Sequence, residues 1–99
     1  PRPALAVVLA AEGYPGPVRR GDAITGLDAD ADDADAKIFH AGTRRDGEAV
    51  LSDGGRVLAV TALGADLAAA QAKAYAIAAQ VRWSGVQYRR DIGWRALRR

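Results

Sequence analysis

The first apolar segment of the chain is a continuous run over residues 4–11, with the sequence ALAVVLAA. A run of this length is typical of a strand covered on both faces, and a short buried helix is the alternative. Gly13 and Pro15 follow within a cluster of turn-forming residues at 12–16. Because Gly and Pro interrupt helices and mark turns, they favour the strand.

Three further strands are predicted between positions 37 and 63, where short apolar segments alternate with turn signals. They cover residues 37–42, 48–52 and 56–63. Asp-Gly at 46–47 and Asp-Gly-Gly at 53–55 are strong hairpin signals. Successive strands with tight turns imply an antiparallel meander. Both faces of the third segment are apolar, so we expect that strand to be central.

The spacing of apolar residues changes to a helical period after Gly64. Asp66 is a good N-cap and predicts a helix from about residue 67 to 81. One face of this helix carries side chains at intervals of three and four: Leu67, Ala70, Ala74, Ile77 and Val81. We expect the helix to lie across the sheet, where its small residues permit close approach.

The final segment, from Trp83 onward, is aromatic and basic. Trp83, Val86 and Tyr88 suggest a short edge strand, and Asp91 is placed to cap a terminal turn. The predicted fold class is therefore α+β: an antiparallel β-meander with one principal helix packed on it and a short C-terminal helical turn. Since we find no repeat and no boundary, residues 1–99 are expected to form a single domain.

Length and composition narrow the classes of function. Ninety-nine residues exclude a complete dinucleotide-binding or kinase fold, and 23 of them are Ala, so the core must be thin. No Cys and a single His exclude disulfides, thiolate nucleophiles and multi-His metal sites. The absence of Met, also at position 1, suggests that the chain starts inside a longer reading frame. Neither a membrane span nor a signal peptide is expected, which makes the cytoplasm the expected compartment.

Charged residues are unevenly distributed, although the net charge is only +2. Five of the ten Asp fall in residues 28–35, where like charges repel and nothing can be buried, so we expect a mobile loop. A calcium loop is the alternative, but Asp33 stands where that loop needs Gly and Phe39 where it needs Glu. Six of the twelve Arg fall in residues 82–99, which suit phosphate or nucleic acid, or else form a solvated end.

Two local motifs offer polar groups that suit an anionic ligand. Gly54 and Gly55 leave backbone N–H groups approachable, and Arg56 directly after them carries a planar fork of donors that matches phosphate or carboxylate. A hairpin turn followed by a surface Arg is the alternative. His40 and Thr43 end a predicted strand and can hydrogen-bond a polar ligand, although a lone His is more often structural.

Six motifs occur in one order along nearly the whole chain, from about residue 5 to 98. They are LAAEGYPG (9–16), GDAITGL (21–27), FHAGT (39–43), GGRVLAVTALG (54–64), AAQAKAYA (69–76) and YRRDIGWRAL (88–97). Together they closely resemble the C-terminal domain of the phosphoribosylamine–glycine ligases, also called glycinamide ribonucleotide synthetases, which are of the ATP-grasp type. A single motif is a weak signal, whereas the ordered series is specific. The acidic segment 28–35 is the main departure.

The resemblance implies the activity of a longer polypeptide. The family joins glycine to 5-phosphoribosylamine in purine biosynthesis while ATP is cleaved to ADP and phosphate. ATP and magnesium or manganese are thus implied for the full-length enzyme, and no cofactor for this chain. The family's N-terminal and ATP-grasp domains precede the matched region, so this chain is not expected to be active by itself. Neither a membrane nor nucleic acid is an expected partner.

The resemblance also implies which residues contact the substrate. In ATP-grasp relatives of purine synthesis, the C-terminal domain closes one side of the active site, and basic residues at its glycine-rich turn face the substrate's phosphate. On this chain the role falls on six residues: Gly54, Gly55 and Arg56 first, and then His40, Thr43 and Arg90. No catalytic or metal-binding residue is implied. A free-standing module that binds nucleic acid or another anion through the Arg-rich C-terminus is the alternative, and a structural domain without a ligand is a third.

Overall fold

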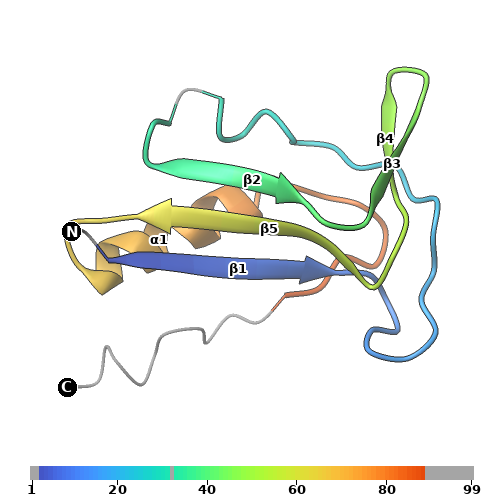
Figure 1. Ribbon diagram of the computed structural model, residues 1–99, viewed down its shortest axis with the longest axis horizontal. Helices are drawn as coiled ribbons and strands as arrows, with labels where there is room; N and C mark the ends of the chain where they lie inside the picture. The colour runs from blue at the N-terminus through green and yellow to red at the C-terminus, as the bar shows by residue number, and fades with distance from the viewer. Residues whose placement is uncertain (1–2, 32, 89–99) are drawn as a thin grey trace.

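A three-stranded antiparallel sheet, one helix and a separate hairpin form the fold (Figure 1). They are seen in a computed structural model that describes residues 3–31 and 33–88. The elements in chain order are β1 (Ala4–Ala10), β2 (Ala36–His40), β3 (Thr43–Asp46), β4 (Ala49–Ser52), β5 (Arg56–Leu63) and α1 (Leu67–Ala78). The sheet has the strand order β1-β5-β2, and β3 pairs with β4. The expected α+β class, an antiparallel sheet with one principal helix, is confirmed.

β5 is the central strand of the sheet, as its apolar pattern predicts. It pairs antiparallel with β1, where Val60 lies opposite Val7, and with β2, where Val60 lies opposite Ile38. These three side chains are buried in the core, on the sheet face that α1 covers. The predicted first strand thus finds its partner some fifty positions later in the chain.

The order of strand pairing differs from the succession that the turn signals suggested. The strand predicted over 37–42 ends earlier, because β2 ends at His40, and β3, which begins at Thr43, is a strand that was not predicted. The hairpin signal at 46–47 is correct, but the turn joins β3 to β4. The second predicted hairpin does not form, since β5 pairs with β1 and β2 and not with β4.

The chain leaves the sheet after β2 at Gly42, whose lack of a side chain allows a close approach to residues 54–56. A Cβ on Gly42 would lie 3.2 Å from the Cα of Gly54 and 2.6 Å from the carbonyl oxygen of Arg56, so the two backbone segments cross in close contact. The N–H of Asp53 also donates to the carbonyl of Gly42 over 2.8 Å. Residues 53–55 therefore cross the end of β2 instead of reversing the chain, and the hairpin stands apart from the sheet (Figure 1).

The residues before β2 complete the hairpin along its second edge. The N–H of Gly21 donates to the carbonyl of Ser52 over 2.6 Å, and the N–H of Ile24 donates to that of Val50 over 2.9 Å. The buried hydroxyl of Ser52 accepts a further bond from the N–H of Asp22. Ile24, in the middle of the GDAITGL motif, is buried in the core.

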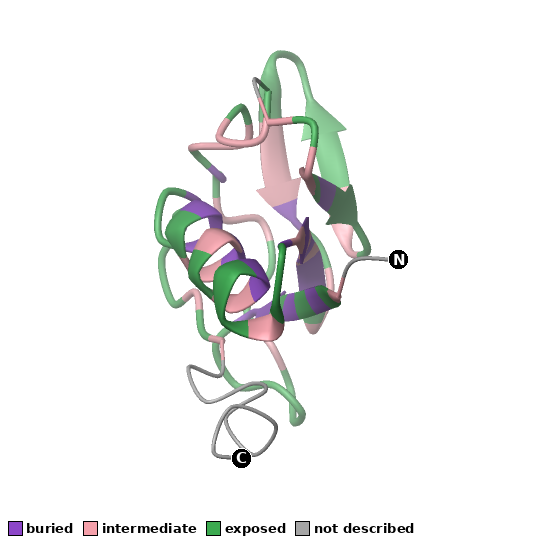
Figure 2. Cartoon of the chain, turned by 90° about the vertical axis from the view of Figure 1, so that its left-hand side faces the viewer, coloured by how far each residue is buried: buried purple, intermediate pink, exposed green. Residues whose placement is uncertain are grey.

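α1 begins where the sequence predicts and ends earlier. The Asp66 carboxylate accepts a hydrogen bond from the N–H of Ala69 over 2.8 Å, which is the expected N-cap. The buried face is made of four residues, Ala70, Ala74, Ile77 and Ala78, and Figure 2 shows it turned toward the sheet. The predicted end at 81 is wrong because the chain there leaves the helix to pair with Thr25, whose N–H donates to the carbonyl of Arg82.

The segment after the helix makes single bridges rather than the suggested edge strand. Gln87 forms an isolated antiparallel bridge with Ala10 at the free edge of β1. Trp83 is buried in the core. The predicted terminal turn with Asp91 lies outside the described residues. In residues 3–31 and 33–88, no helix combines the length and apolar character that crossing a bilayer requires.

The acidic loop before β2 uses its carboxylates as hydrogen-bond acceptors. One oxygen of Asp30 accepts from the N–H of Ile38 over 2.9 Å, and Asp33 accepts from the N–H of Asp35 over the same distance. The Lys73 ammonium on α1 lies 3.1 Å from the Asp33 carboxylate. The N–H of Asp35 and the Lys73 ammonium lower the pKa of Asp33. The loop is thereby attached to both β2 and α1.

Candidate functional site

Three motifs that are far apart in the chain meet at one end of the sheet. The N–H of Ala11, just after β1, donates to the carbonyl of Gly55, just before β5, over 2.8 Å. The crossing of Gly42 over Gly54 joins the corner between β2 and β3 to the same place. Backbone contacts therefore assemble this corner from the LAAEGYPG, FHAGT and GGRV motifs.

A β-bulge at the start of β5 directs Arg56 away from the core. β1 and β5 pair in register as far as Leu58, but the next residue of β1, Ala10, pairs with Arg56, which leaves Val57 as the extra residue. Under strict alternation Arg56 would share the buried face of Leu58. The bulge places it opposite Ala10, on the side of β1 that carries the partly exposed Val8.

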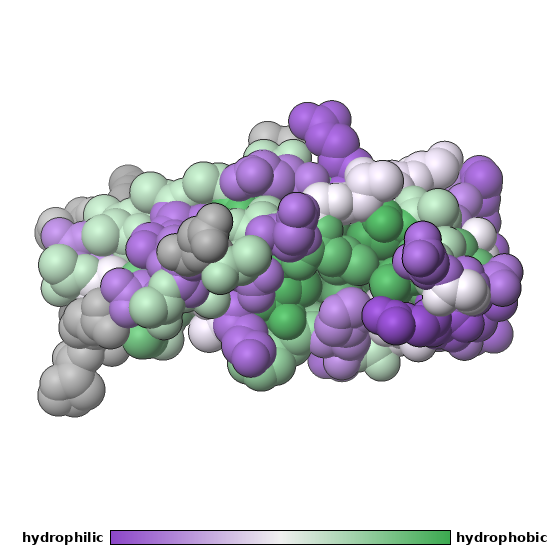
Figure 3. Space-filling model, turned by 90° about the horizontal axis from the view of Figure 1, so that it is seen from above, coloured by the Kyte–Doolittle hydropathy of each residue, from purple (hydrophilic) through white to green (hydrophobic). Residues whose placement is uncertain are grey.

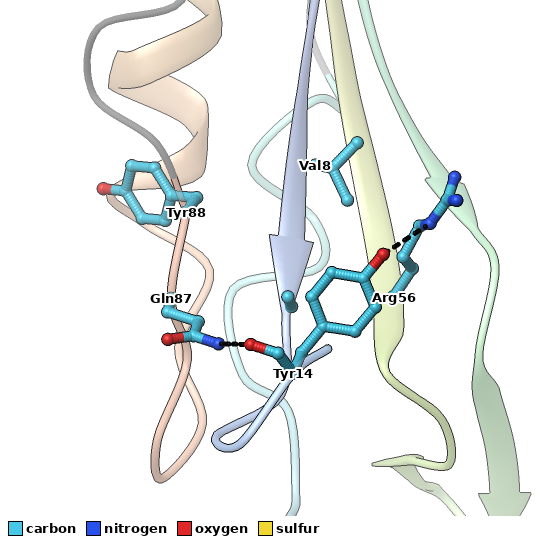
Figure 4. A pocket seen from close by; sticks show the side chains of 6 residues that line it. Val8, Tyr14, Arg56, Gln87 and Tyr88 are labelled. Atoms are coloured by element: carbon cyan, nitrogen blue, oxygen red, sulfur yellow. Dashed lines mark hydrogen bonds between the residues drawn. The ribbon is translucent and has the colours of Figure 1, made fainter. Parts of the chain in front are cut away.

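Arg56 lines a surface pocket of about 510 Å³ (Figure 4). The other lining residues come from β1, the turn after it and the end of the described chain: Val8, Ala10, Tyr14, Gln87 and Tyr88. The Nε–H of Arg56 donates to the hydroxyl oxygen of Tyr14 over 3.1 Å. Among the described residues, the terminal amino groups of Arg56 meet no hydrogen-bond acceptor or carboxylate, so their N–H donors are available to a ligand.

The two glycines before Arg56 have different places in this site. In the described part of the chain, the N–H groups of Gly54 and Gly55 donate to no other group, as an anion site requires. Gly55 has a further role that the sequence did not reveal. A Cβ there would lie 2.5 Å from Cδ1 of Tyr14, so the absence of a side chain makes room for the aromatic ring.

Tyr14 and Gln87 are functional candidates that sequence reasoning missed. The motif around Tyr14 reads as a turn, and no local signal connects it with an Arg 42 positions later. Gln87 fastens that turn, because its side-chain Nε2 donates to the carbonyls of Ala11 (3.0 Å) and Tyr14 (3.3 Å). It lies in a segment without hydrophobic periodicity, so only the folded chain reveals its partners.

His40 and Thr43, the second predicted pair, lie together at the corner between β2 and β3. His40 Nδ1 and Thr43 Oγ1 are hydrogen-bonded over 3.0 Å. The imidazole is exposed, and neither side chain lines the pocket of Arg56. Their corner therefore lies near the glycine pair only because Gly42, between them in the chain, approaches Gly54. The two side chains themselves do not reach the pocket. Arg90, the sixth predicted residue, lies outside the described residues.

The polar groups of the site are mainly hydrogen-bond donors. Those without a partner among the described residues are the terminal amino groups of Arg56 and the N–H groups of the two glycines, whereas the Gln87 amide nitrogen already donates to two carbonyls. Within the described ranges, no group of three or more His, Cys, Asp or Glu side chains is placed to hold a metal ion. A donor-rich corner with one fixed guanidinium suits the oxygens of a phosphate or a carboxylate.

An apolar row crosses the sheet face opposite α1, beside the pocket. Val8 on β1 and Phe39 on β2 both lie opposite Ala59 of β5, so the three side chains share that face. Val8 is 38 % exposed and Phe39 is 50 % exposed. Figure 3 views the molecule from another side, from above Figure 1, and shows hydrophobic residues there in the middle between hydrophilic ones. Exposed apolar area of this kind often marks a surface that another domain covers.

Comparison with known proteins gives consistent matches. Residues 4–95 match the family model described as phosphoribosylglycinamide synthetase, C domain. Phosphoribosylamine–glycine ligases of Pseudomonas aeruginosa and Vibrio cholerae are 54 % and 50 % identical to this chain over its whole length, which corresponds to 23 % of theirs. A solved phosphoribosylamine–glycine ligase from Thermotoga maritima superimposes with a TM-score of 0.77 at 39 % identity, covering 89 % of this chain and 21 % of that one.

Proposed function

The chain belongs to the phosphoribosylglycinamide synthetase C-domain family, and from this premise we propose that it works as the C-terminal domain of a phosphoribosylamine–glycine ligase. In that role it closes one side of an active site in which glycine is joined to 5-phosphoribosylamine with cleavage of ATP. The other domains of the longer polypeptide supply the sites for ATP and for magnesium or manganese. The enzyme works in the cytoplasm.

Within this ligase, Arg56 binds the phosphate of 5-phosphoribosylamine. The observation that carries the proposal is the state of its guanidinium: Nε is engaged with Tyr14, and the terminal amino groups have no partner among the described residues. Two parallel N–H donors match two oxygens of a phosphate dianion, and such charge-assisted bonds are stronger than neutral ones. The N–H groups of Gly54 and Gly55, which directly precede Arg56 in the chain, also have no partner among the described residues, although neither glycine lines the pocket.

The apolar row beside the pocket supports the place of this domain in a larger enzyme. We assign Val8, Ala59 and Phe39 to the surface that the preceding domains cover. Because Val8 also lines the pocket of Arg56, that contact would close the pocket on one side and exclude water. The alternative function, binding of nucleic acid through the Arg-rich end, depends on residues 89–99, which lie outside the described ranges.

The test is Arg56→Ala in a full-length ligase that carries this domain. The Michaelis constant for phosphoribosylamine should rise about 10- to 150-fold, because a hydrogen bond to a charged group contributes about 1.5–3 kcal/mol. The constant for ATP should stay within about twofold. Arg56→Lys should recover only part of the loss, since an ammonium lacks the planar fork.

Arg45→Ala is the matched control, because Arg45 is an exposed Arg on the neighbouring β3 and does not line the pocket. It should leave both constants unchanged. An equal rise of the constants for ATP and phosphoribosylamine in Arg56→Ala, or no rise in either, would remove Arg56 from phosphate binding.

A further inference from the structure

We propose that Tyr14 is a positioning residue, which holds the Arg56 guanidinium so that it binds the substrate phosphate end-on through its two terminal amino groups. The inference rests on the proposed phosphate-binding role of Arg56. It adds the orientation of the bound phosphate and the residue that sets it.

The first step concerns the two edges of a guanidinium. An Arg can bind two oxygens side-on, through Nε–H and one terminal amino group, or end-on, through both terminal groups. In this structure Nε–H already donates to the Tyr14 hydroxyl over 3.1 Å. Figure 4 shows the hydroxyl on the Nε side of the guanidinium, with the terminal nitrogens turned away from it. The side-on edge is therefore occupied, and the end-on edge is open.

The second step concerns how Tyr14 itself is held. Its ring lies against the backbone of Gly55, where a Cβ would be only 2.5 Å from Cδ1 and 3.0 Å from Cε1. Its carbonyl accepts a bond from the Gln87 side chain over 3.3 Å. The turn that presents it depends on Gly13, whose φ of 95° is favourable only for glycine and whose added Cβ would meet the carbonyl of Pro17.

The hydroxyl position is thus set by the turn at Gly13, by the Gln87 side chain and by the backbone of Gly55, the residue directly before Arg56. An exposed Arg ordinarily samples many rotamers, and ordering it lowers the free energy gained on binding. A hydroxyl that is held in place removes part of that disorder before the phosphate arrives. Tyr14 acts on the phosphate only through Arg56.

The test is Tyr14→Phe in the full-length ligase, which removes one oxygen and keeps the ring on Gly55. The Michaelis constant for phosphoribosylamine should rise about 2- to 12-fold, the range expected for releasing one rotamer-rich side chain. The constant for ATP should not change. In an Arg56→Ala background the same substitution should have no further effect, because its target is absent.

A second readout follows the hydrogen bond without activity. In the 15N-labelled 99-residue chain, the Nε–H proton of Arg56 should exchange with water measurably faster in Tyr14→Phe than in the unmodified chain. Equal exchange in the two would refute the positioning role. A Tyr14→Phe effect that persists in full in the Arg56→Ala background would also overturn it.

The two proposals fail in different ways. If Arg56→Ala raises the constant for phosphoribosylamine and Tyr14→Phe does not, the phosphate role stands and the positioning role is wrong. If Arg56→Ala has no effect on that constant, the proposed function of Arg56 fails, and the end-on binding mode is refuted with it.

Discussion

Gly55→Ala is the sharpest probe of how the site is built, because the same substitution at the neighbouring Gly54 is a matched control. An Ala Cβ at position 55 would lie 2.5 Å from Cδ1 of Tyr14, inside the closest approach of two carbon atoms. At Gly54 the nearest atom to an added Cβ is the Cα of Gly42 at 3.4 Å, an ordinary contact. Neither residue has a positive φ, so backbone strain does not separate the two substitutions.

The magnitude follows from what must move. Overpacking in a well-packed core costs about 1–3 kcal/mol. Tyr14 is 37 % exposed and its ring can swing outward, which places Gly55→Ala near the lower end, at about 1 kcal/mol. Gly54→Ala should be neutral or stabilising by a few tenths of a kcal/mol, since Ala lowers the entropy of the unfolded chain.

Urea unfolding of the 99-residue chain measures both variants, and the exchange rate of the Arg56 Nε–H proton shows whether the ring has left its place. Gly55→Ala should speed this exchange and Gly54→Ala should not. Combining Gly55→Ala with Tyr14→Ala should abolish the added cost, because no ring remains to be displaced. Equal loss of stability in the two glycine variants, or slow exchange retained in Gly55→Ala, would refute the packing of the Tyr14 ring against Gly55.

Two further substitutions test contacts away from the site. Asp33 has a lowered pKa, so its contribution to stability is complete above the ordinary Asp pKa of about 3.9 and is lost as the pH falls through the lowered value. Asp33→Asn should therefore flatten the pH dependence of the urea midpoint below about pH 4. An unchanged profile would contradict the contact of Asp33 with Lys73 and the N–H of Asp35. A Cβ at Gly64 would meet the backbone nitrogen of Ala70, where only backbone can move, so Gly64→Ala should lower the stability by about 2–3 kcal/mol. That corresponds to a fall in melting temperature of more than about 8 °C, and a fall below about 2 °C would show that α1 can shift without cost.

Local patterns were sufficient for the elements whose cause is local. The Asp66 cap and the spacing of Ala70, Ala74 and Ile77 identify α1 and its buried face. The apolar faces of residues 56–63 identify the central strand. In each case a few neighbouring side chains determine both the conformation and the direction of burial.

Pairing was not predictable from the same patterns. The tight-turn reading at 53–55 fails because Gly42 and Gly54 serve a crossing and not a reversal, and a glycine pair looks alike in both. Neighbouring strands pair often, and nothing near residue 56 indicates that its strand joins β1 from the start of the chain. Long-range partners of this kind depend on the closed shape of the whole core.

The candidate site divides in the same way. Arg56 and the glycines before it were accessible, because a guanidinium beside unhindered N–H groups is a chemical signal within three residues. Tyr14 and Gln87 were not, since their hydrogen bonds join residues that are far apart in the sequence. His40 and Thr43 were found as a pair, and whether they touch the substrate stays a prediction.

The extra residue in β5 has a consequence for how this family can change. Counting back from Leu58, Arg56 reaches the open side of the sheet because Val57 is not matched by a residue of β1. Because side chains alternate between the two faces of a strand, the direction of Arg56 depends on how many residues separate it from the buried Leu58 and on how they pair with β1. Side chains of the core can be exchanged for others of similar volume while the guanidinium keeps its direction. A deletion of one position in this stretch would turn the charge toward α1, so we expect the site to tolerate changes of residue type here better than changes of length.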